Sequence, residues 1–342
     1  MNVELKKLIL LLMLNALIVL YTSNGFASNS ISLFEEKRLS KNLYSTEIEY
    51  QPPGWFDWLT HVPSNLKNFV IDIKPQKNYR TLAYIFGSTF LLVHYDQKIL
   101  DESQSFARKL GLIDDDTHGR ETHTLIDWRI GGKQSPLLAP ANLNSFFYYI
   151  GDGLTHLGVV IGFASYCWLN NNARALSTAS QIVETLFVTG IVIQVLKRIT
   201  GREAPFKSTG SGGKWQWFPD QKKYEENVPK YDAFPSGHLA TVMATMTIVA
   251  DNYPEYTYIR LLGYTLMTLL GFGVLNNGVH WAGDYPLAIA IGYHAAKVVG
   301  NRYENKRKLP VVNKRYARQK NRFLILPELG ANYAAARAVY LY

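Results

Sequence analysis

The stretch Phe234-Pro235-Ser236-Gly237-His238 joins a polar segment rich in tryptophan, lysine and glycine to an apolar run at residues 239–250. Proline and glycine interrupt the backbone here, and Ser236 is a good N-cap for a helix over the apolar run. The free N–H groups and the positive dipole end of such a helix favour an anion, and His238 lies in its first turn as a proton donor. Taken alone, the pentapeptide is equally typical of a capped helix with a surface histidine.

The rest of the chain indicates an all-α protein. Its apolar pattern predicts helices at residues 81–95, 143–169, 176–199, 238–252, 256–275 and 285–300. Two shorter helices are expected near residues 55–62 and 103–110, with loop over most of residues 96–142. We find no β alternation before residue 314, so the expected fold is a bundle of about six helices. A long insertion at residues 206–232 separates two of the helices, and such insertions are usually functional lids or disordered.

The N-terminus has the pattern of a secretory signal. Lys6 and Lys7 precede an apolar run at residues 8–21, and the small residues Gly25 and Ala27 follow. The run is short for a membrane-spanning helix, so we expect a signal peptide over residues 1–27 that is cleaved after Ala27. The alternative is an uncleaved anchor. In both cases the remainder leaves the cytoplasm, which predicts a location in the cell envelope.

The remainder divides into three expected parts. Residues 28–78 are a polar, proline-interrupted lead-in, and residues 79–300 are the helical domain, whose motifs fall within residues 143–300. Residues 301–342 are a basic tail that carries much of the net charge of +9 and ends in an irregular segment or a small β hairpin. The chain has 342 residues, 47% of them hydrophobic, which allows a sizeable core. Its single cysteine excludes an internal disulfide and a multi-cysteine metal site.

Two further patterns flank the central stretch. Upstream, Lys197 stands at a helix end, and Arg202 and Pro205 follow; this is also ordinary helix-ending sequence. Downstream, His280 and Asp284 are four residues apart. On a helical turn this carboxylate can accept a hydrogen bond from one imidazole nitrogen and so orient the other as a base or nucleophile. Asp284 also precedes a proline closely, and it could instead cap the last helix.

The order of these patterns resembles the type 2 phosphatidic acid phosphatase superfamily, which also includes bacterial non-specific acid phosphatases and vanadium haloperoxidases. The patterns are a lysine with Gly-Arg-x-x-Pro at a helix end, then Pro-Ser-Gly-His, then Gly-Val-His-x-x-x-Asp. The resemblance covers roughly residues 143–300. It implies a helical bundle whose active site is built from these three motifs.

The resemblance also implies a role for each matching residue. His280 corresponds to the nucleophile that receives the phosphoryl group, Asp284 to the aspartate that orients it, and His238 to the general acid for the leaving oxygen. The pair Ser236-Gly237 corresponds to the phosphate cradle, and Lys197 to its first cation. Phosphoryl transfer depends on such charge stabilisation, and no metal is required where cations and a helix N-terminus supply the positive field.

Two arginines of the family pattern are missing. Ala204 occupies the position directly before the proline of the first motif, and Val274 occupies the position six residues before the nucleophilic histidine. Arg202 is two residues from the first vacancy, and we predict that it binds phosphate instead, because a guanidinium can grip two oxygens at once. The lysines of the insertion, Lys207, Lys214 and Lys230, are the alternative source of positive charge.

The implied function is a phosphatase that needs no metal or other cofactor and acts through a phosphohistidine. Its substrate would be a phosphate monoester or diphosphate, either a phosphorylated small molecule or a lipid phosphate, and the apolar helices favour a lipid. Membrane association is expected, and a nucleic-acid partner is not. The alternatives are a catalytically inactive scaffold of the same fold and a vanadate-dependent haloperoxidase.

The placement in the envelope stays open between two arrangements. Charge-free stretches at residues 153–173 and 261–279 are long enough to span a bilayer. Five spans would put the motifs outside the cytoplasm and the basic tail inside, as the positive-inside tendency expects. A mean hydropathy of −0.08 is low for a protein with many spans, and it favours a soluble or peripheral periplasmic domain instead.

Overall fold

The computed structural model describes residues 53–54, 56–73, 75–112, 122–127, 129–130, 133–134, 136–305, 323–330 and 333–340. The expected signal peptide and residues 28–52 of the lead-in lie outside the described residues. The chain divides into two units, residues 1–24 with 50–304 and residues 25–49 with 305–342, and each is described by itself.

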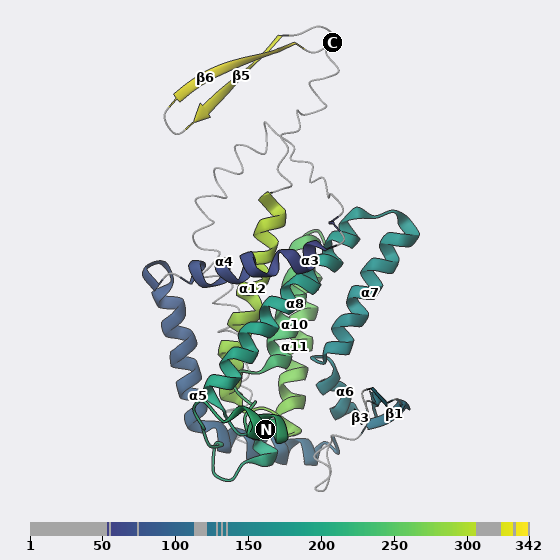
Figure 1. Cartoon of the computed structure of the whole chain (residues 1–342), viewed down its shortest axis with the longest axis vertical. Coiled ribbons are helices and arrows are strands. Elements are labelled where there is room, and N and C mark those ends of the chain that lie inside the picture. Colours follow the sequence, from purple (N-terminus) through teal and green to yellow (C-terminus); the bar gives the residue numbers. More distant parts are fainter. Residues whose placement is uncertain are drawn as a thin grey trace. The chain divides into compact units, whose positions relative to one another are not determined.

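The first unit is a bundle of long helices, which confirms the all-α fold class (Figure 1). The long members are α5 (Pro75–Lys109), α7 (Gly153–Asn170), α8 (Ala173–Thr200), α10 (Gly237–Asn252), α11 (Tyr258–Asn276) and α12 (Tyr285–Asn305). The shorter helices are α3 (Asp57–Thr60), α4 (Val62–Asp72), α6 (Leu143–Tyr149) and α9 (Gln221–Glu226). The single 3₁₀ turns are η1 (Pro205–Lys207), η2 (Val228–Lys230) and η3 (Ala282–Asp284).

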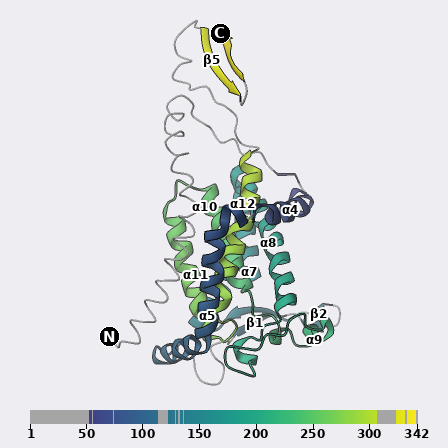
Figure 2. The same cartoon turned by 90° about the vertical axis from the view of Figure 1, so that its left-hand side faces the viewer.

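Helix α10 occupies the centre of the bundle. It packs against α8 and α11, and α11 in turn lies against α5 (Figure 2). Leu239, Met243 and Met246 of α10 are buried in the largest apolar cluster, together with side chains of α8, α11 and α12. On α12, a Cβ atom added to Gly292 would collide with the backbone of Ala240, so the absence of a side chain lets α12 approach α10 closely. The helix that follows the central stretch is therefore held on several sides.

Helix α5 is much longer than the sequence predicted. It runs for 35 residues and joins the two expected helices at 81–95 and 103–110 through a stretch that we had assigned to loop. Leu92, Ile99 and Leu100 form its buried face, and Asp96 lies on the same face with no exposed surface. An acid in the middle of an apolar face breaks the helical pattern, which is why the sequence indicated an end there. Helix α4 likewise falls within the expected lead-in.

The region between α5 and α6 contains short strands, so the expectation of no strand before residue 314 was wrong. Strand β1 (Thr122–Ile126) pairs antiparallel with β4 (Leu137–Pro140), and β2 (Arg129–Ile130) with β3 (Lys133–Gln134). All five residues of β1 are exposed. Because no face of this strand is buried, its sequence lacks the apolar alternation from which a strand is recognised.

The helix expected at residues 143–169 is broken. Helices α6 and α7 meet at a bend of 64°. Asp152 caps α7 by accepting a hydrogen bond from the N–H of Leu154 at 2.8 Å. A Cβ atom on Gly151 would lie 2.7 Å from the Cβ of His238, so this glycine lets the bend pack directly on the start of α10. The break therefore brings the end of α6 beside the central histidine.

The insertion at residues 206–232 is an ordered loop with short helical turns. Its first half is held by Glu203, which is 1% exposed and accepts hydrogen bonds from the backbone N–H groups of Thr209 and Lys214 at 3.0 and 3.2 Å. The backbone of Arg202 forms isolated bridges with Trp215 and Asp232. These contacts fix both ends of the insertion beside the start of α10.

The second unit contains a hairpin, which is one of the two forms that the sequence allowed for the tail. Strand β5 (Phe323–Gly330) pairs antiparallel with β6 (Tyr333–Tyr340), from Phe323 opposite Tyr340 to Gly330 opposite Tyr333.

Two helices in the described part of the chain, α8 and α11, are long and apolar enough to cross a membrane, and the bent pair α6–α7 could form a third span. This is fewer than the five spans of one predicted arrangement. Large apolar side chains on the helices are exposed, among them Phe90 at 78%, Trp168 at 81% and Leu261 at 70%. An apolar surface spread over several helices is typical of contact with lipid, and it indicates membrane association.

Candidate active site

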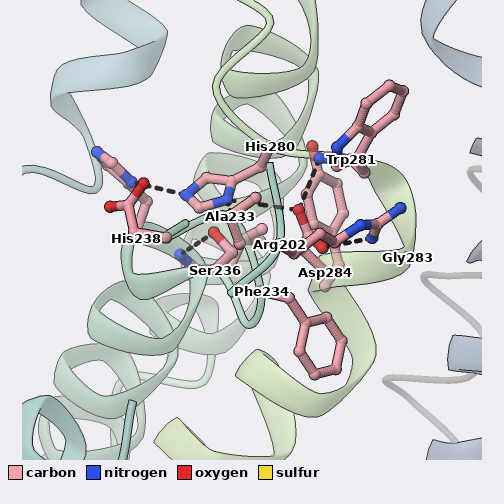
Figure 3. A network of polar contacts seen from close by, with 12 residues as sticks. Arg202, Ala233, Phe234, Ser236, His238, His280, Trp281, Gly283 and Asp284 are labelled. Atoms are coloured by element: carbon pink, nitrogen blue, oxygen red, sulfur yellow. Dashed lines mark hydrogen bonds and ion pairs between the residues drawn. The ribbon is translucent and has the colours of Figure 1, made fainter. Parts of the chain in front are cut away.

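Two histidines from separate elements meet at the start of α10. The Nδ1 atom of His238 lies 3.3 Å from Nε2 of His280, and the two rings are inclined at 70° (Figure 3). His238 is the second residue of α10, and His280 lies in the turn between α11 and η3. The sequence therefore identified the pair correctly as residues that the fold brings together.

His280 is oriented by a backbone carbonyl as well as by a carboxylate. Its Nδ1 lies 2.8 Å from the carbonyl oxygen of Ala233 and 3.6 Å from Oδ2 of Asp284 (Figure 3). The Nδ1 proton is therefore donated to Ala233, and Nε2 is left with its lone pair facing His238. Asp284 is close enough to stabilise positive charge on the ring. The four-residue spacing predicts that it also accepts the hydrogen bond from His280, but the carbonyl oxygen of Ala233 is the nearer acceptor.

Asp284 belongs to a buried ion cluster with Arg202 and Asp96. The guanidinium of Arg202 donates to Oδ1 of Asp284 and to Oδ2 of Asp96, both at 2.6 Å, and none of the three side chains is exposed. The other oxygen of Asp96 accepts from the N–H of Gly283 at 2.8 Å, and that of Asp284 accepts from the N–H of Trp281 at 2.8 Å. Both carboxylates are thus fixed on two sides.

The contacts of Arg202 do not fit the phosphate-binding role that we predicted for it. Its guanidinium also donates to the carbonyl of Gly212 at 2.7 Å, and the rings of Trp215 and Trp281 lie 4.7 and 5.4 Å from it. It is absent from the described lining of the pocket beside the histidines. Two carboxylates attract the guanidinium more strongly than an exposed cleft would, because they neutralise it where water cannot reach.

The histidines open onto a pocket of about 480 Å³. Lys197, His238 and His280 are among the residues that line it, together with Ala204 and Asp232. The ammonium group of Lys197 lies 3.3 Å from Oδ2 of Asp232, and the lysine side chain is 8% exposed. Tyr148, Tyr149, Phe206 and Val279 form an apolar part of the same lining. The pocket thus combines two histidines in contact, a cation and apolar walls.

Ser236 caps α10, as predicted. Its Oγ accepts from the N–H of Leu239 at 3.5 Å, and its own N–H donates to the backbone carbonyl of Asp284 at 3.0 Å (Figure 3). Ser236 has no exposed surface and is not among the described pocket-lining residues, so its side chain serves the helix end. A Cβ atom on Gly237 would lie 3.9 Å from Nζ of Lys197, which places the first turn of α10 beside that cation.

The protein environment keeps both histidines neutral. Desolvation by burial, with the positive charge of Lys197 as the next cause, lowers the pKa of His280 to about 3. Desolvation likewise holds the pKa of His238 well below its usual value, and the neighbouring His280 adds to the effect. Burial raises the pKa of Asp284 to about 6, although Arg202 opposes this shift. A neutral imidazole with a free Nε2 is the form that can act as a nucleophile.

Comparison with known proteins links this geometry to one family. The family model of the PAP2 superfamily matches residues 178–308, which include all three motifs. Residues 178–308 belong to the PAP2 superfamily. No curated protein matches the chain. A solved structure, a transmembrane PAP2 type phosphatidylglycerolphosphate phosphatase from Bacillus subtilis, is similar at 12% identity and a TM-score of 0.37, covering 65% of this chain and 94% of that one.

Several residues of the candidate site were not found from the sequence. Asp96 is 106 residues before Arg202, and its signal was an acid at helical spacing between buried Leu92 and Leu100. Asp232 and Asn277 line the pocket but belong to no pattern that the sequence offers.

Among the described residues, no three His, Cys, Asp or Glu side chains are grouped as a metal site would require.

Proposed function

We propose that this protein is an envelope phosphatase that hydrolyses a phosphate monoester or diphosphate through a phosphohistidine at His280. Membership of residues 178–308 in the PAP2 superfamily supports phosphatase activity in general terms. The observation that carries the specific proposal is the pair of ring nitrogens, His280 Nε2 and His238 Nδ1, 3.3 Å apart at a pocket that Lys197 also lines.

The reaction would proceed in two displacements. In the first, the lone pair of His280 Nε2 attacks phosphorus, the bond from phosphorus to the leaving oxygen breaks, and His238 donates a proton to that oxygen. In the second, water attacks the phosphohistidine, His238 takes a proton from the water, and the nitrogen–phosphorus bond breaks to release inorganic phosphate. Lys197 and the N–H groups at the start of α10 would stabilise the charge on the equatorial oxygens in both steps.

Substrate binding would supply the protonation state that the acid step needs. The pKa of His238 is lowered in the empty site because of burial and neighbouring positive charge. A phosphate dianion in the pocket brings negative charge beside the imidazole and favours its protonated form. His238 would therefore become a proton donor when substrate is bound, while His280, whose Nε2 faces phosphorus, remains unprotonated.

The ion cluster behind His280 would act on the intermediate. Attack on phosphorus places a positive charge on the His280 ring, and the Asp284 carboxylate lies 3.6 Å from its Nδ1. Arg202 and the N–H of Trp281 hold that carboxylate in place. We therefore assign Arg202 and Asp96 as positioning residues that act through Asp284.

We further propose that the substrate is a lipid phosphate and that the site lies outside the cytoplasm. The apolar exposed faces of α7 and α8, which share the unit with the pocket, favour a substrate that partitions into the membrane. The N-terminal sequence pattern, with Lys6 and Lys7 before an apolar run, supports export.

A non-catalytic scaffold is the second candidate, because two positions lack the arginines of the family pattern. Ala204 is part of the pocket lining where the family pattern has an arginine, and Val274, at the other such position, is fully buried in the apolar core. Neither side chain can bind phosphate. An inactive protein would still be expected to fold and to keep the buried ion cluster.

The test is phosphate release by the purified protein from lipid and soluble phosphates, compared with His280→Ala. We expect loss of at least about 10³-fold in kcat for His280→Ala, because removal of a nucleophile eliminates the covalent route. His94→Ala, which changes an exposed histidine of α5, is the matched control and should keep wild-type activity. Equal activity of wild type and His280→Ala would refute the mechanism, and no activity on any substrate would favour the scaffold.

A further inference from the structure

The proposed phosphatase site is short of cationic side chains for phosphate. Of the described residues that line the pocket, Lys197 alone is a lysine or arginine, and it is already paired with Asp232 at 3.3 Å. Arg202 is occupied by Asp96 and Asp284. In the transition state the transferred phosphoryl group carries negative charge on three equatorial oxygens. One lysine and a helix N-terminus would compensate only part of this charge.

Asn277 is an unused donor in the same pocket. It lies directly after α11, it lines the pocket, and its side chain belongs to a residue that is only 1% exposed. Its Nδ2 atom is buried and has no hydrogen-bond partner among the residues that the structure describes. A buried amide donor without a partner costs free energy in the empty protein, and a ligand oxygen would remove that cost.

The neighbouring contacts fix the direction of this amide. Its Oδ1 accepts a hydrogen bond from Nδ2 of Asn144, a fully buried residue of α6. Because the oxygen is turned toward Asn144, the nitrogen of the same amide is turned away from it. The Asn277 amide is thus oriented by the hydrogen bond to its Oδ1, and its Nδ2 can donate to a ligand.

The position of Asn277 relative to the nucleophile is also fixed. It lies three positions before His280, and between them Gly278 adopts the left-handed conformation at φ 66°. The carbonyl of Gly278 accepts from the N–H of Phe206 at 2.9 Å, and a Cβ atom on Gly278 would lie 3.3 Å from Phe206. This tight turn restricts the position of Asn277 relative to His280, and both residues line the same pocket.

We infer that Asn277 binds the phosphoryl group of the substrate through its side-chain Nδ2, as a neutral donor in a site that lacks the guanidiniums of the family pattern. This inference rests on the proposed phosphatase function. It would give the site an uncharged amide donor beside Lys197, from a residue three positions before the nucleophile. Its N–H would compensate charge on the phosphoryl oxygens in a pocket where Asp152 and Asp232 outweigh the single lysine.

The test compares Asn277→Ala and Asn277→Asp with the wild type in two assays, turnover of the most active phosphate substrate and binding of orthovanadate. We expect Asn277→Ala to lose about 10- to 100-fold in kcat/KM and a similar factor in vanadate affinity, because one hydrogen bond to a charged group is lost. Asn277→Asp should lose more in both assays, since a carboxylate repels the anion. Asn276→Ala is the control, because Asn276 is equally buried but does not line the pocket.

A merely structural role would give a different result. If Asn277 only joins α11 to α6, Asn144→Ala should lower activity as much as Asn277→Ala, and Asp and Ala at position 277 should be equivalent at equal thermal stability. Either outcome would overturn the inference, as would unchanged vanadate binding in Asn277→Ala. A wild type that binds vanadate in an Asn277-dependent way but releases no phosphate would refute the proposed function and leave the binding site intact.

Discussion

Removal of Arg202 is the most informative perturbation of this protein. The guanidinium lies between Asp96 and Asp284 at 2.6 Å from each, and all three side chains are fully buried. Arg202→Ala leaves two carboxylates facing a small cavity without a cation. Breaking a buried pair by removing one partner costs about 3–5 kcal/mol. A typical domain has only about 5–15 kcal/mol of stability, so we expect a folded but markedly weakened protein.

The loss should also depend on pH, with a sign that follows from the pKa shifts. Burial raises the pKa of Asp96 and of Asp284 to about 6 each while Arg202 opposes the shift. Without the guanidinium both pKa values rise further, so the folded variant retains protons that the unfolded chain releases. Relative to the wild type, the variant therefore loses stability as pH rises from 6 to 8, by up to about 1.4 kcal/mol per pH unit for each extra proton held. At pH 5 both acids are largely neutral, and the variant should approach the wild type.

The assay is thermal and denaturant unfolding of the purified protein in detergent at pH 5, 6, 7 and 8. A loss of 3–5 kcal/mol corresponds to a Tm lower by about 6–20 °C at the upper pH values. The matched control is Arg198→Ala, which removes an exposed arginine one turn away on α8 and should change stability by less than about 1 kcal/mol. Asp96→Asn combined with Arg202→Ala should recover part of the loss. A Tm for Arg202→Ala within 2 °C of Arg198→Ala at pH 8 would refute the reasoning.

Two further predictions concern activity. Below pH 6 we expect kcat/KM to fall, because burial raises the pKa of Asp284 to about 6 and the protonated acid no longer stabilises a positive His280 ring. The Asp284→Asn variant should keep a small residual activity that does not fall below pH 6. A fall that persists in this variant would have to come from titration of the substrate. Asp232→Asn should bind inorganic phosphate more tightly by about 3- to 10-fold, because it frees the Lys197 ammonium that Asp232 now pairs at 3.3 Å, and weaker inhibition by phosphate would contradict this.

The parts of the fold that depend on local sequence were predictable. The helix after Ser236 begins where its cap and the apolar run placed it, and α10 ends at Asn252, as expected. The two histidines were predicted to share a site because the order of their motifs resembles that of a known superfamily. Contacts between distant segments were not predictable in this way. Asp96 meets Gly283 across 187 positions, and nothing in either segment specifies the other.

Arg202 shows where reasoning from spacing fails. Its distance along the chain from Lys197 and Ala204 allows it to reach the pocket, and the sequence gives no sign of the two acids that hold it elsewhere. Gly201 ends α8 in a left-handed conformation at φ 53°, and the backbone of Arg202 then bridges to Trp215 and Asp232. The direction of the side chain follows from these tertiary contacts. Reach along a chain limits which residues can meet, but burial of opposite charges decides which of them do.

The charges at the pocket imply that phosphate binding and protonation are coupled. With both histidines neutral, the lining carries one positive charge from Lys197 and two negative charges from Asp152 and Asp232, a net formal charge of +1 − 2 = −1. A phosphate dianion must therefore enter a site that is not positively charged as a whole. Protonation of His238 when phosphate binds supplies the missing positive charge, so the affinity for phosphate should rise as pH falls. Over the same pH range the Asp284 carboxylate that stabilises the intermediate becomes protonated. These opposed requirements predict a bell-shaped dependence of kcat/KM on pH, with its acid limb set by Asp284 and its alkaline limb by His238 in the presence of substrate.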